Sequence, residues 1–422
     1  MLKRVGPCGK FAPRPSYIFA PVGVKAPAIL GDRMKITKVD LTCVSGPWER
    51  PDFPLGDRQV QALDIYPEFN VDRGRGSSDR LQAIYVEIGT DEGVSGLFGP
   101  IESTQAFMIA TSLRPYLLGR DPLANELLLD QMWRLDRHGR SGAFATAISP
   151  VDCALWDLKG KAWGQPVYRL LGGPTRERVP VYASMLGFSA DPQQAAATAL
   201  EYRDQGYTAQ KWFFRYGPGD GAAGKEKNLV QARALRQALG PHYTLMFDAF
   251  MGWDVPYAVE MVRALAPLEP RWMEEPIPPE RVGGLRTVRQ AASVPLATGE
   301  HVFNRWQVKE LLEAGAVDVL QTDPDWVGGI TEQVKICALG SAFEVPVIAH
   351  GHSLLPPLHL AAAQSPTTVP LVEFLIRYQG TKQYFHKPLY WPRDGALELP
   401  DLPGLGLVLD EDKIDTREPL SF

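Results

Sequence analysis

Residues 243–300 read YTLMFDAFMGWDVPYAVEMVRALAPLEPRWMEEPIPPERVGGLRTVRQAASVPLATGE, and this stretch decides the fold. Three short apolar runs, YTLMFDA, RWMEEPI and VPLATGE, alternate in it with longer segments of helical composition. Such alternation is typical of parallel strands joined by helices. The stretch therefore predicts consecutive β/α units.

The same pattern continues on both sides of this stretch. Before it stand VPVYAS (179–184) and AQKWFF (209–214), and after it stand DVLQTD (318–323), VPVIAH (345–350) and LVEFL (371–375). Eight such strands favour a closed barrel of TIM type over an open sheet. We therefore expect an α/β protein whose barrel begins near residue 150.

A smaller unit is expected before the barrel. MKITKVDLTCV (34–44) alternates polar and apolar residues like a half-buried strand, and residues 81–100 resemble two strands around a Thr-Asp-Glu-Gly turn. Helical segments near 104–118 and 124–137 complete an α+β domain. The predicted parts are an N-terminal extension rich in Pro and Gly (1–33), the α+β domain (34–150), the barrel (151–378) and a C-terminal segment that returns to the small domain (379–422).

The loop between the first two predicted strands, at 46–69, is long, aromatic and charged. Loops of this length within compact domains commonly act as lids, or are disordered. We favour a lid, with Trp48, Arg50 and Asp52 as candidates for closing over a substrate.

The composition limits the classes of function. Of 422 residues, 45% are hydrophobic and 22% are charged, which are the proportions of a globular protein with a sizeable core. A formal net charge of −5 provides no basic surface for nucleic acid or an anionic membrane, so we expect neither partner. The cysteines are scattered without a CxxC pair, which argues against a disulfide framework or a zinc knuckle and favours the cytoplasm.

Carboxylates stand at the ends of three successive predicted strands. Asp248, Glu274 and Glu300 follow one another at intervals of 26 residues, close to one β/α repeat each. Active sites of barrels lie at the carboxyl ends of the strands, so these three side chains are expected to converge there. Crowded carboxylates need a cation, and hard oxygen ligands suit Mg²⁺. We therefore predict a magnesium site.

The register of charged residues continues along the chain. Asp323 ends the strand after Glu300, His350 ends the next, and Glu373 lies in the last, while Lys211 ends the strand before Asp248. A histidine oriented by an aspartate can remove a proton next to a carboxylate, and a metal and a lysine can neutralise the resulting enediolate. Asp323 and His350 are the expected pair, and His352 is placed on the loop beyond.

Each of these residues alone has an ordinary explanation. A single Asp or Glu at a strand end is usually a helix N-cap or a solvated loop residue. Polar groups in six consecutive repeats among apolar strand residues would be costly without a shared purpose. We therefore interpret the set as an active site.

The segment AISPVDCALWDLKGKAWGQPVYRLLGG (147–173) resembles the helix that joins the two domains in the mandelate racemase group of the enolase superfamily. FDAFMGWD, WMEEP, ATGEH, QTDPDWVGGIT, IAHGHS and VEFL follow that group in order, over roughly residues 34–410. The resemblance implies a modified (β/α)7β barrel with an N-terminal α+β capping domain. It also implies a homo-oligomer, commonly an octamer, that acts on a small acid.

Carried over by position, the resemblance implies the metal ligands Asp248, Glu274 and Glu300, the base pair Asp323 and His350, and the substrate-binding acid Glu373. Many members of the group have Lys-x-Lys after the second strand, whereas this chain has Lys211-Trp212-Phe213. The lysine that acts on the opposite face is therefore absent, which argues against a two-base racemase.

The same segment, continuing as KWFFRYGPGDG, is similar to the L-rhamnonate dehydratase subgroup of that family. The function implied is a Mg²⁺-dependent hydro-lyase that removes water from an acid sugar of the aldonate class. Two alternatives stay open: a one-base epimerase or cycloisomerase on the same scaffold, and a non-catalytic metal-binding barrel.

Overall fold

The computed structural model describes residues 34–49, 56–71 and 78–422. The predicted extension at 1–33 and the lid candidates Arg50 and Asp52 lie outside the described residues. Two sheets organise the described part of the chain, one of four strands and one of eight. The larger sheet carries the candidate site.

Seven strands of the larger sheet are parallel and follow the order β10-β4-β5-β6-β7-β8-β9. Their bounds are β4 (Arg178–Ser184), β5 (Ala209–Phe213), β6 (Thr244–Asp248), β7 (Met273–Glu274), β8 (Leu296–Thr298), β9 (Val319–Leu320) and β10 (Val372–Leu375). The strand expected at 345–350 is reduced to one parallel bridge between Leu320 and Val347. Pro346, which lacks an N–H group, cannot extend that ladder.

One buried cluster fills the inside of the curled sheet. It takes a side chain from the region of each successive strand: Tyr182, Ala209, Met246, Trp272, Ala297, Val319 and Ile348. Successive strand residues point to opposite faces, and layers of this kind occupy the interior of (β/α) barrels. The expected barrel architecture is therefore present.

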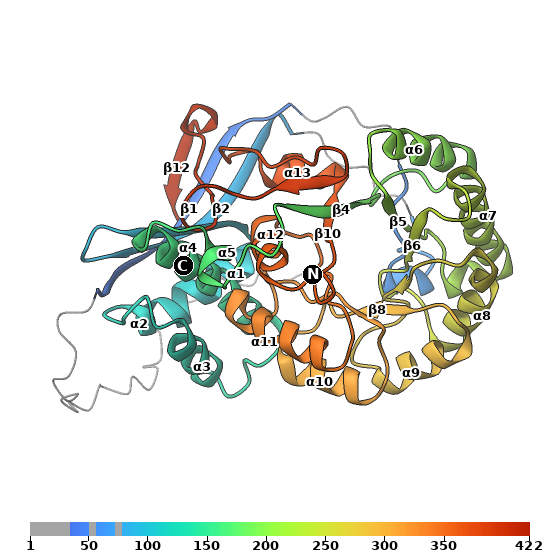
Figure 1. Ribbon diagram of the computed structural model, residues 1–422, viewed down its shortest axis with the longest axis horizontal. Helices are drawn as coiled ribbons and strands as arrows, with labels where there is room; N and C mark the ends of the chain where they lie inside the picture. The colour runs from blue at the N-terminus through green and yellow to red at the C-terminus, as the bar shows by residue number, and fades with distance from the viewer. Residues whose placement is uncertain (1–33, 50–55, 72–77) are drawn as a thin grey trace, which may run out of the picture. The chain divides into compact units, whose positions relative to one another are not determined.

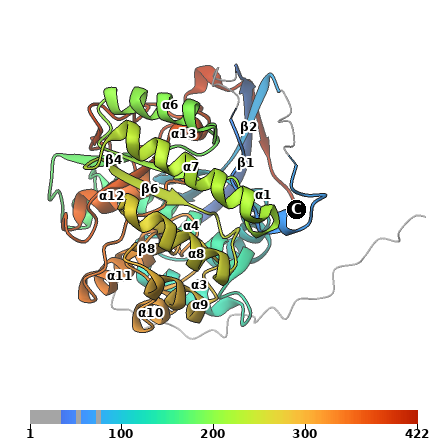
Figure 2. The same cartoon turned by 90° about the vertical axis from the view of Figure 1, so that its right-hand side faces the viewer.

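Helices cover the outer face of the strands, and Figure 1 shows α6 to α11 around them. The helices are α6 (Pro192–Asp204), α7 (Gly221–Leu239), α8 (Val255–Leu265), α9 (Val282–Ala291), α10 (Arg305–Glu313), α11 (Gly329–Ala342) and α12 (Leu355–Ala363). In Figure 2, α6, α7 and α8 lie side by side, in agreement with their contacts. Side chains of Asp191, Asp254 and Asn304 accept backbone N–H bonds at the starts of α6, α8 and α10, which explains where these helices begin.

The smaller sheet is antiparallel, in the order β12-β1-β2-β3. Its strands are β1 (Ile36–Pro47), β2 (Arg80–Thr90), β3 (Ser95–Ile101) and β12 (Thr416–Pro419). Nearby helices are α1 (Ser103–Met108), α2 (Arg114–Leu117), α3 (Asn125–Leu135), α4 (Gly142–Ala162) and α5 (Val167–Leu170). Because α4 contacts both β3 and α11, one helix joins this sheet to the barrel.

The C-terminal segment contacts both sheets. After α13 (Ile376–Lys382), β11 (Ala396–Glu398) pairs with β4, and β12 pairs with β1. Helix α4 continues across residue 150 and α13 across residue 378. The domain boundaries drawn from the sequence stay predictions.

The described half of the long loop is tied to the barrel. The Val60 N–H donates to the Phe214 carbonyl at 2.8 Å, and Asp57 accepts from the Ala190 N–H at 2.6 Å. At the other end of the gap, the ring of Trp48 contacts that of Tyr384 edge-on at 4.9 Å. The later part of the loop thus lies against the barrel, whereas its start contacts the C-terminal segment after α13. Its role as a lid stays a prediction.

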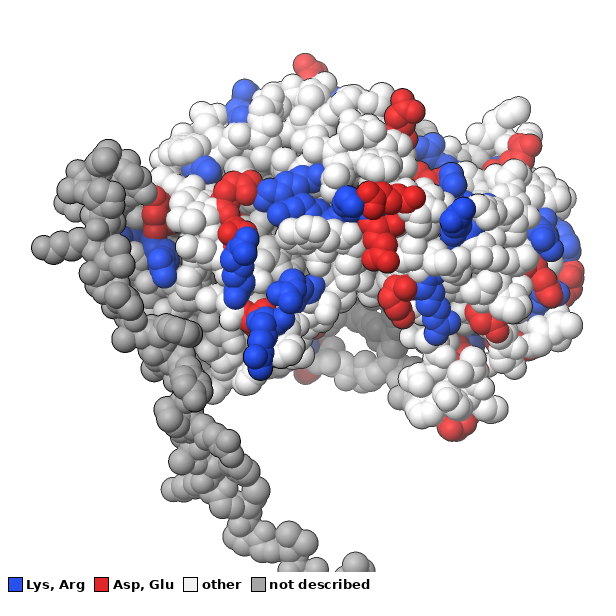
Figure 3. Space-filling view, turned by 90° about the horizontal axis from the view of Figure 1, so that it is seen from below, with Lys and Arg blue, Asp and Glu red and all other residues white. Residues whose placement is uncertain are grey.

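Two observations bear on possible partners of the protein. In the described part of the chain, no helix combines the length and apolarity needed to cross a membrane. The face in Figure 3 carries acidic and basic side chains interspersed with one another.

Candidate active site

The charged residues selected from the sequence lie at the carboxyl ends of the barrel strands. Asp248 and Glu274 are the last residues of β6 and β7, Glu300 follows β8 by two residues, and Lys211 and Glu373 lie in β5 and β10. All five side chains belong to residues that are at most 5% exposed. Buried charges are retained only where they are paired or bind a cation. Their partners therefore define the site.

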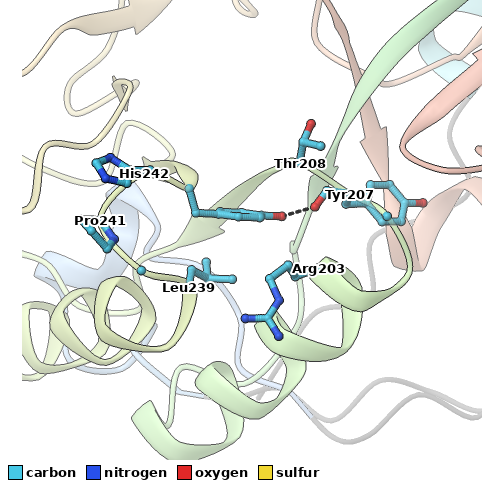
Figure 4. A pocket seen from close by; sticks show the side chains of 9 residues that line it. Arg203, Tyr207, Thr208, Leu239, Pro241 and His242 are labelled. Atoms are coloured by element: carbon cyan, nitrogen blue, oxygen red, sulfur yellow. Dashed lines mark hydrogen bonds between the residues drawn. The ribbon is translucent and has the colours of Figure 1, made fainter.

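A different hollow lies at the other end of the same strands. It is lined by Arg203, Tyr207, Leu239 and His242, among others, next to the starts of β5 and β6 (Figure 4). Tyr243 also lines it, and its hydroxyl donates to the Tyr207 carbonyl. Because barrel active sites lie at the carboxyl ends of the strands, this hollow is not the candidate site.

Lys211 is the cation at the centre of the carboxylates. Its Nζ atom lies 3.1 Å from Asp248 Oδ2 and 2.9 Å from Glu373 Oε1, and it also contacts Glu274 Oε1. Burial alone would lower the pKa of Lys211, but the negative charges of Glu274 and Glu373 outweigh it and raise that pKa well above its usual value. Lys211 therefore stays protonated.

One lysine does not neutralise three carboxylates. Burial raises the pKa of Asp248 to about 6, and it raises that of Glu274 well above the usual value. Glu373 differs, because the charge of Lys211 overcomes the effect of burial and lowers the pKa of Glu373 to about 2. Glu274 is held further by N–H groups of Trp272 at 2.9 Å and Gln321 at 2.6 Å. Asp248 and Glu274 therefore favour either a proton or a further cation beside them.

Glu300 lies in a second group of ligand atoms. Within the described ranges, the carboxylates of Glu275 and Glu300 and the ring of His301 offer three atoms that all lie within 4.8 Å of one another. Burial raises the pKa of Glu300 to about 7. Burial would lower the pKa of His301, but its bond to Glu275 raises it to about 9. The predicted metal ligands therefore fall into two groups. Asp248 and Glu274 contact Lys211, whereas Glu300 lies beside Glu275.

Asp323 and His350 are brought together. His350 Nδ1 lies 2.8 Å from Asp323 Oδ2, and the Asp325 N–H donates to Asp323 Oδ1 at 2.7 Å. Burial, followed by the charge of Asp325, raises the pKa of Asp323 well above its usual value. His350 Nε2 lies 3.4 Å from Glu300 Oε1. A histidine that shares its Nδ1 proton with a carboxylate has Nε2 as its basic atom, and here that atom faces the carboxylates.

A second histidine–aspartate pair lies beside the first. His352, on the loop before α12, has its Nδ1 atom 2.7 Å from Asp325 Oδ2 and its Nε2 atom 2.6 Å from Lys382 Nζ. The indole of Trp326 lies against both histidine rings. Sequence reasoning did not select Asp325, Trp326 or Lys382. The sequence does contain a sign of this pair. Asp325 and His352 are separated by the same 27-residue interval as Asp323 and His350.

Comparisons with known proteins agree with this architecture. Residues 68–172 match the mandelate racemase / muconate lactonizing enzyme N-terminal domain, and residues 194–413 match the enolase C-terminal domain-like family. The chain is 32% identical over 402 residues to an L-rhamnonate dehydratase of Saccharopolyspora erythraea, covering 92% of this chain and 99% of that protein.

Solved structures give the same assignment. The rhamnonate dehydratase of Gibberella zeae, complexed with Mg, aligns with a TM-score of 0.78 at 28% identity, over 91% of this chain and 97% of its own. The 3,6-anhydro-D-galactonate cycloisomerase of Zobellia galactanivorans aligns with a TM-score of 0.71 at 28% identity, over 90% and 100% of the two chains. The chain belongs to the enolase superfamily, in the group of mandelate racemase and muconate lactonizing enzyme.

Proposed function

We propose that the protein is a Mg²⁺-dependent hydro-lyase that dehydrates an acid sugar of the aldonate class to a 2-keto-3-deoxy acid. The observation that carries the proposal is the pair His350 and Asp323 beside buried carboxylates and Lys211 at one end of the barrel. The relatives named L-rhamnonate dehydratase support the reaction class.

The donor set fits magnesium. Asp248, Glu274 and Glu300 are buried oxygen donors, and burial raises the pKa values of all three, so a bound cation would stabilise their ionised forms. Mg²⁺ prefers such hard ligands, and the Gibberella zeae relative was solved with Mg. We propose these three residues as its ligands. Bound there, the ion would act as a Lewis acid toward the substrate carboxylate.

The chain's own residues account for proton movement. The Nδ1–H group of His350 donates a hydrogen bond to Asp323, so Nε2 is the atom that accepts the proton from the substrate α-carbon. The C–O bond at the β-carbon then breaks, and the hydroxyl leaves as water with the proton from Nε2. Lys211 and Glu373 would bind the substrate and balance the charge that develops on it. The enol product becomes the keto acid.

Phe213 limits the reaction to one face. Its ring lies 5.2 Å from Lys211 Nζ, so the position where relatives have a second lysine is apolar. Phenylalanine cannot exchange protons, and racemisation needs exchange on both faces of the α-carbon. A one-base epimerase or cycloisomerase remains the alternative, favoured by the similarity to the Zobellia galactanivorans cycloisomerase.

A substrate screen tests the proposal. The full chain with Mg²⁺ would be incubated with a library of aldonic and aldaric acids, and 2-keto acid would be measured together with the mass of each product. We expect loss of one water from at least one aldonate. A product of unchanged mass would instead identify the epimerase or cycloisomerase, and no product from any acid would favour the non-catalytic barrel.

Magnesium binding should release protons near neutral pH. The metal-free protein holds protons on Asp248 and Glu300, whose pKa values are raised to about 6 and about 7, and metal ligands must be ionised. Affinity for Mg²⁺ should therefore fall as the pH is lowered from 8 to 5.5. Calorimetry at pH 6.5 in two buffers of different ionisation enthalpy should give different binding heats, and at pH 8 the difference should shrink. Equal heats at pH 6.5 would contradict this.

We also propose that the protein is a symmetric homo-oligomer, as the family resemblance implies. Light scattering of the purified chain should give a mass several times that of one subunit. A monomeric mass would exclude it.

A further inference from the structure

His350 and His352 share one support. The ring of Trp326 stacks on that of His350, with centroids 5.1 Å apart at 23°. It also contacts the ring of His352 at a tilt, with centroids 4.8 Å apart at 45°. Protein interiors are close-packed, so a ring that moves shifts its neighbours. The orientation of His352 therefore bears on that of His350.

Both ring nitrogens of His352 are engaged. A charged lysine can only donate, so Lys382 donates to Nε2 of His352. The ring proton is then on Nδ1, which donates a hydrogen bond to Asp325. Asp325 also accepts from the Ser353 hydroxyl at 2.6 Å. His352 is thus a neutral bridge between an anion and a cation, with no free nitrogen to act as a base.

The backbone links this bridge to the catalytic groups. The His352 N–H donates at 3.2 Å to Asp323 Oδ2, the same oxygen that pairs with His350. The adjacent Gly351 N–H donates to Glu373 Oε2 at 2.9 Å. A shift of His352 would therefore disturb the groups that set both the base and the substrate-binding acid.

The bridge also reaches the small sheet. Gln105, in α1, donates to the Asp325 carbonyl at 3.3 Å, and Glu102, just after β3, lies 3.9 Å from His352 Nε2. Asp325 is 2% exposed, and burial lowers the pKa of Lys382. Burying charged groups costs free energy unless they are paired, so we expect this arrangement to have a function.

We propose that Asp325, His352 and Lys382 form a positioning chain that fixes the ring of His350 without touching the substrate. This inference rests on the function proposed for His350. In that reaction His350 acts twice, removing the α-proton and then protonating the hydroxyl on the next carbon. Proton removal needs one orientation of the ring, whereas elimination needs the ring to hold that orientation until the hydroxyl leaves.

The test measures α-proton exchange with solvent deuterium against dehydration, on the best substrate with Mg²⁺. This ratio does not depend on the fraction of folded enzyme, so a loss of stability alone leaves it unchanged. His352→Ala should lower kcat on the order of 10- to 100-fold with little change in KM, and should raise exchange relative to dehydration. Lys382→Met should act in the same direction, and Lys382→Arg, which keeps a donor, should restore most of the activity.

His242→Ala, in the hollow at the opposite end of the strands, is the matched control and should behave as wild type. An unchanged ratio in His352→Ala, or equal losses in Lys382→Met and Lys382→Arg, would overturn the positioning role.

A measurement without substrate separates this inference from the proposed reaction. Nitrogen-15 NMR of histidine-labelled protein should show His352 neutral with its proton on Nδ1, and His352→Ala should shift the ring resonances of His350. A proton on Nε2 of His352, or unshifted His350 resonances, would refute the chain even in an active enzyme. If wild type neither exchanges nor dehydrates any acid sugar, the proposed function fails instead.

Discussion

Replacement of His350 by Asn is expected to abolish both dehydration and exchange of the substrate α-proton with solvent. Asn cannot take up a proton, and loss of a general base typically costs on the order of 10²–10⁴-fold in rate. The loss should be larger here because the same histidine would also protonate the leaving hydroxyl. Exchange is read by NMR in deuterated solvent, and dehydration by release of 2-keto acid.

Three controls accompany this variant. Binding of Mg²⁺ should be retained, because His350 is not among the proposed ligands. His352→Asn should be much milder, since both nitrogens of His352 are already engaged. Asp323→Asn should lower the rate by disturbing the proton and charge of His350, without eliminating substrate binding. If His350→Asn kept exchange while His352→Asn lost it, the base would be wrongly assigned.

The positions of the strand-end residues were accessible from the sequence because the β/α repeat is nearly constant. A spacing of 26 residues between Asp248, Glu274 and Glu300 is enough to put them at one end of a parallel barrel. The pairing of Asp323 with His350 follows from the same logic, since adjacent parallel strands place their carboxyl ends side by side. The structure brings that pair to 2.8 Å.

The contacts made by the side chains were not accessible in this way. Glu274 and Glu275 are neighbours, and which one faces a metal depends on how the chain leaves β7. Glu275 has a φ of 37°, a left-handed backbone conformation that no pattern in this sequence predicts. Similarly, Lys382 reaches His352 from α13, a helix that follows a different strand. Such contacts depend on tertiary packing, whereas the repeat spacing is local.

Replacement of Glu274 by Gln is expected to abolish turnover by removing one of three charges that hold Mg²⁺. Mutation of a residue that only supports a metal ligand typically lowers metal affinity about 10–100-fold, so mutation of a ligand itself should lower it further. Glu275→Gln is the matched change on the adjacent residue and should act less directly. Titration calorimetry of Mg²⁺ with each variant gives the affinities independently of any substrate.

The comparison is sharp because the two glutamates have different partners. Glu274 contacts Lys211, Trp272 and Gln321, whereas Glu275 lies with Glu300 and His301 in the one group of three ligand atoms found among the described residues. Binding of the ion by Glu274 would add a cation beside a carboxylate that these three partners already contact. If Glu275→Gln lost Mg²⁺ while Glu274→Gln kept it, the ion would instead bind at Glu275 and Glu300, and Glu274 would serve to hold Lys211.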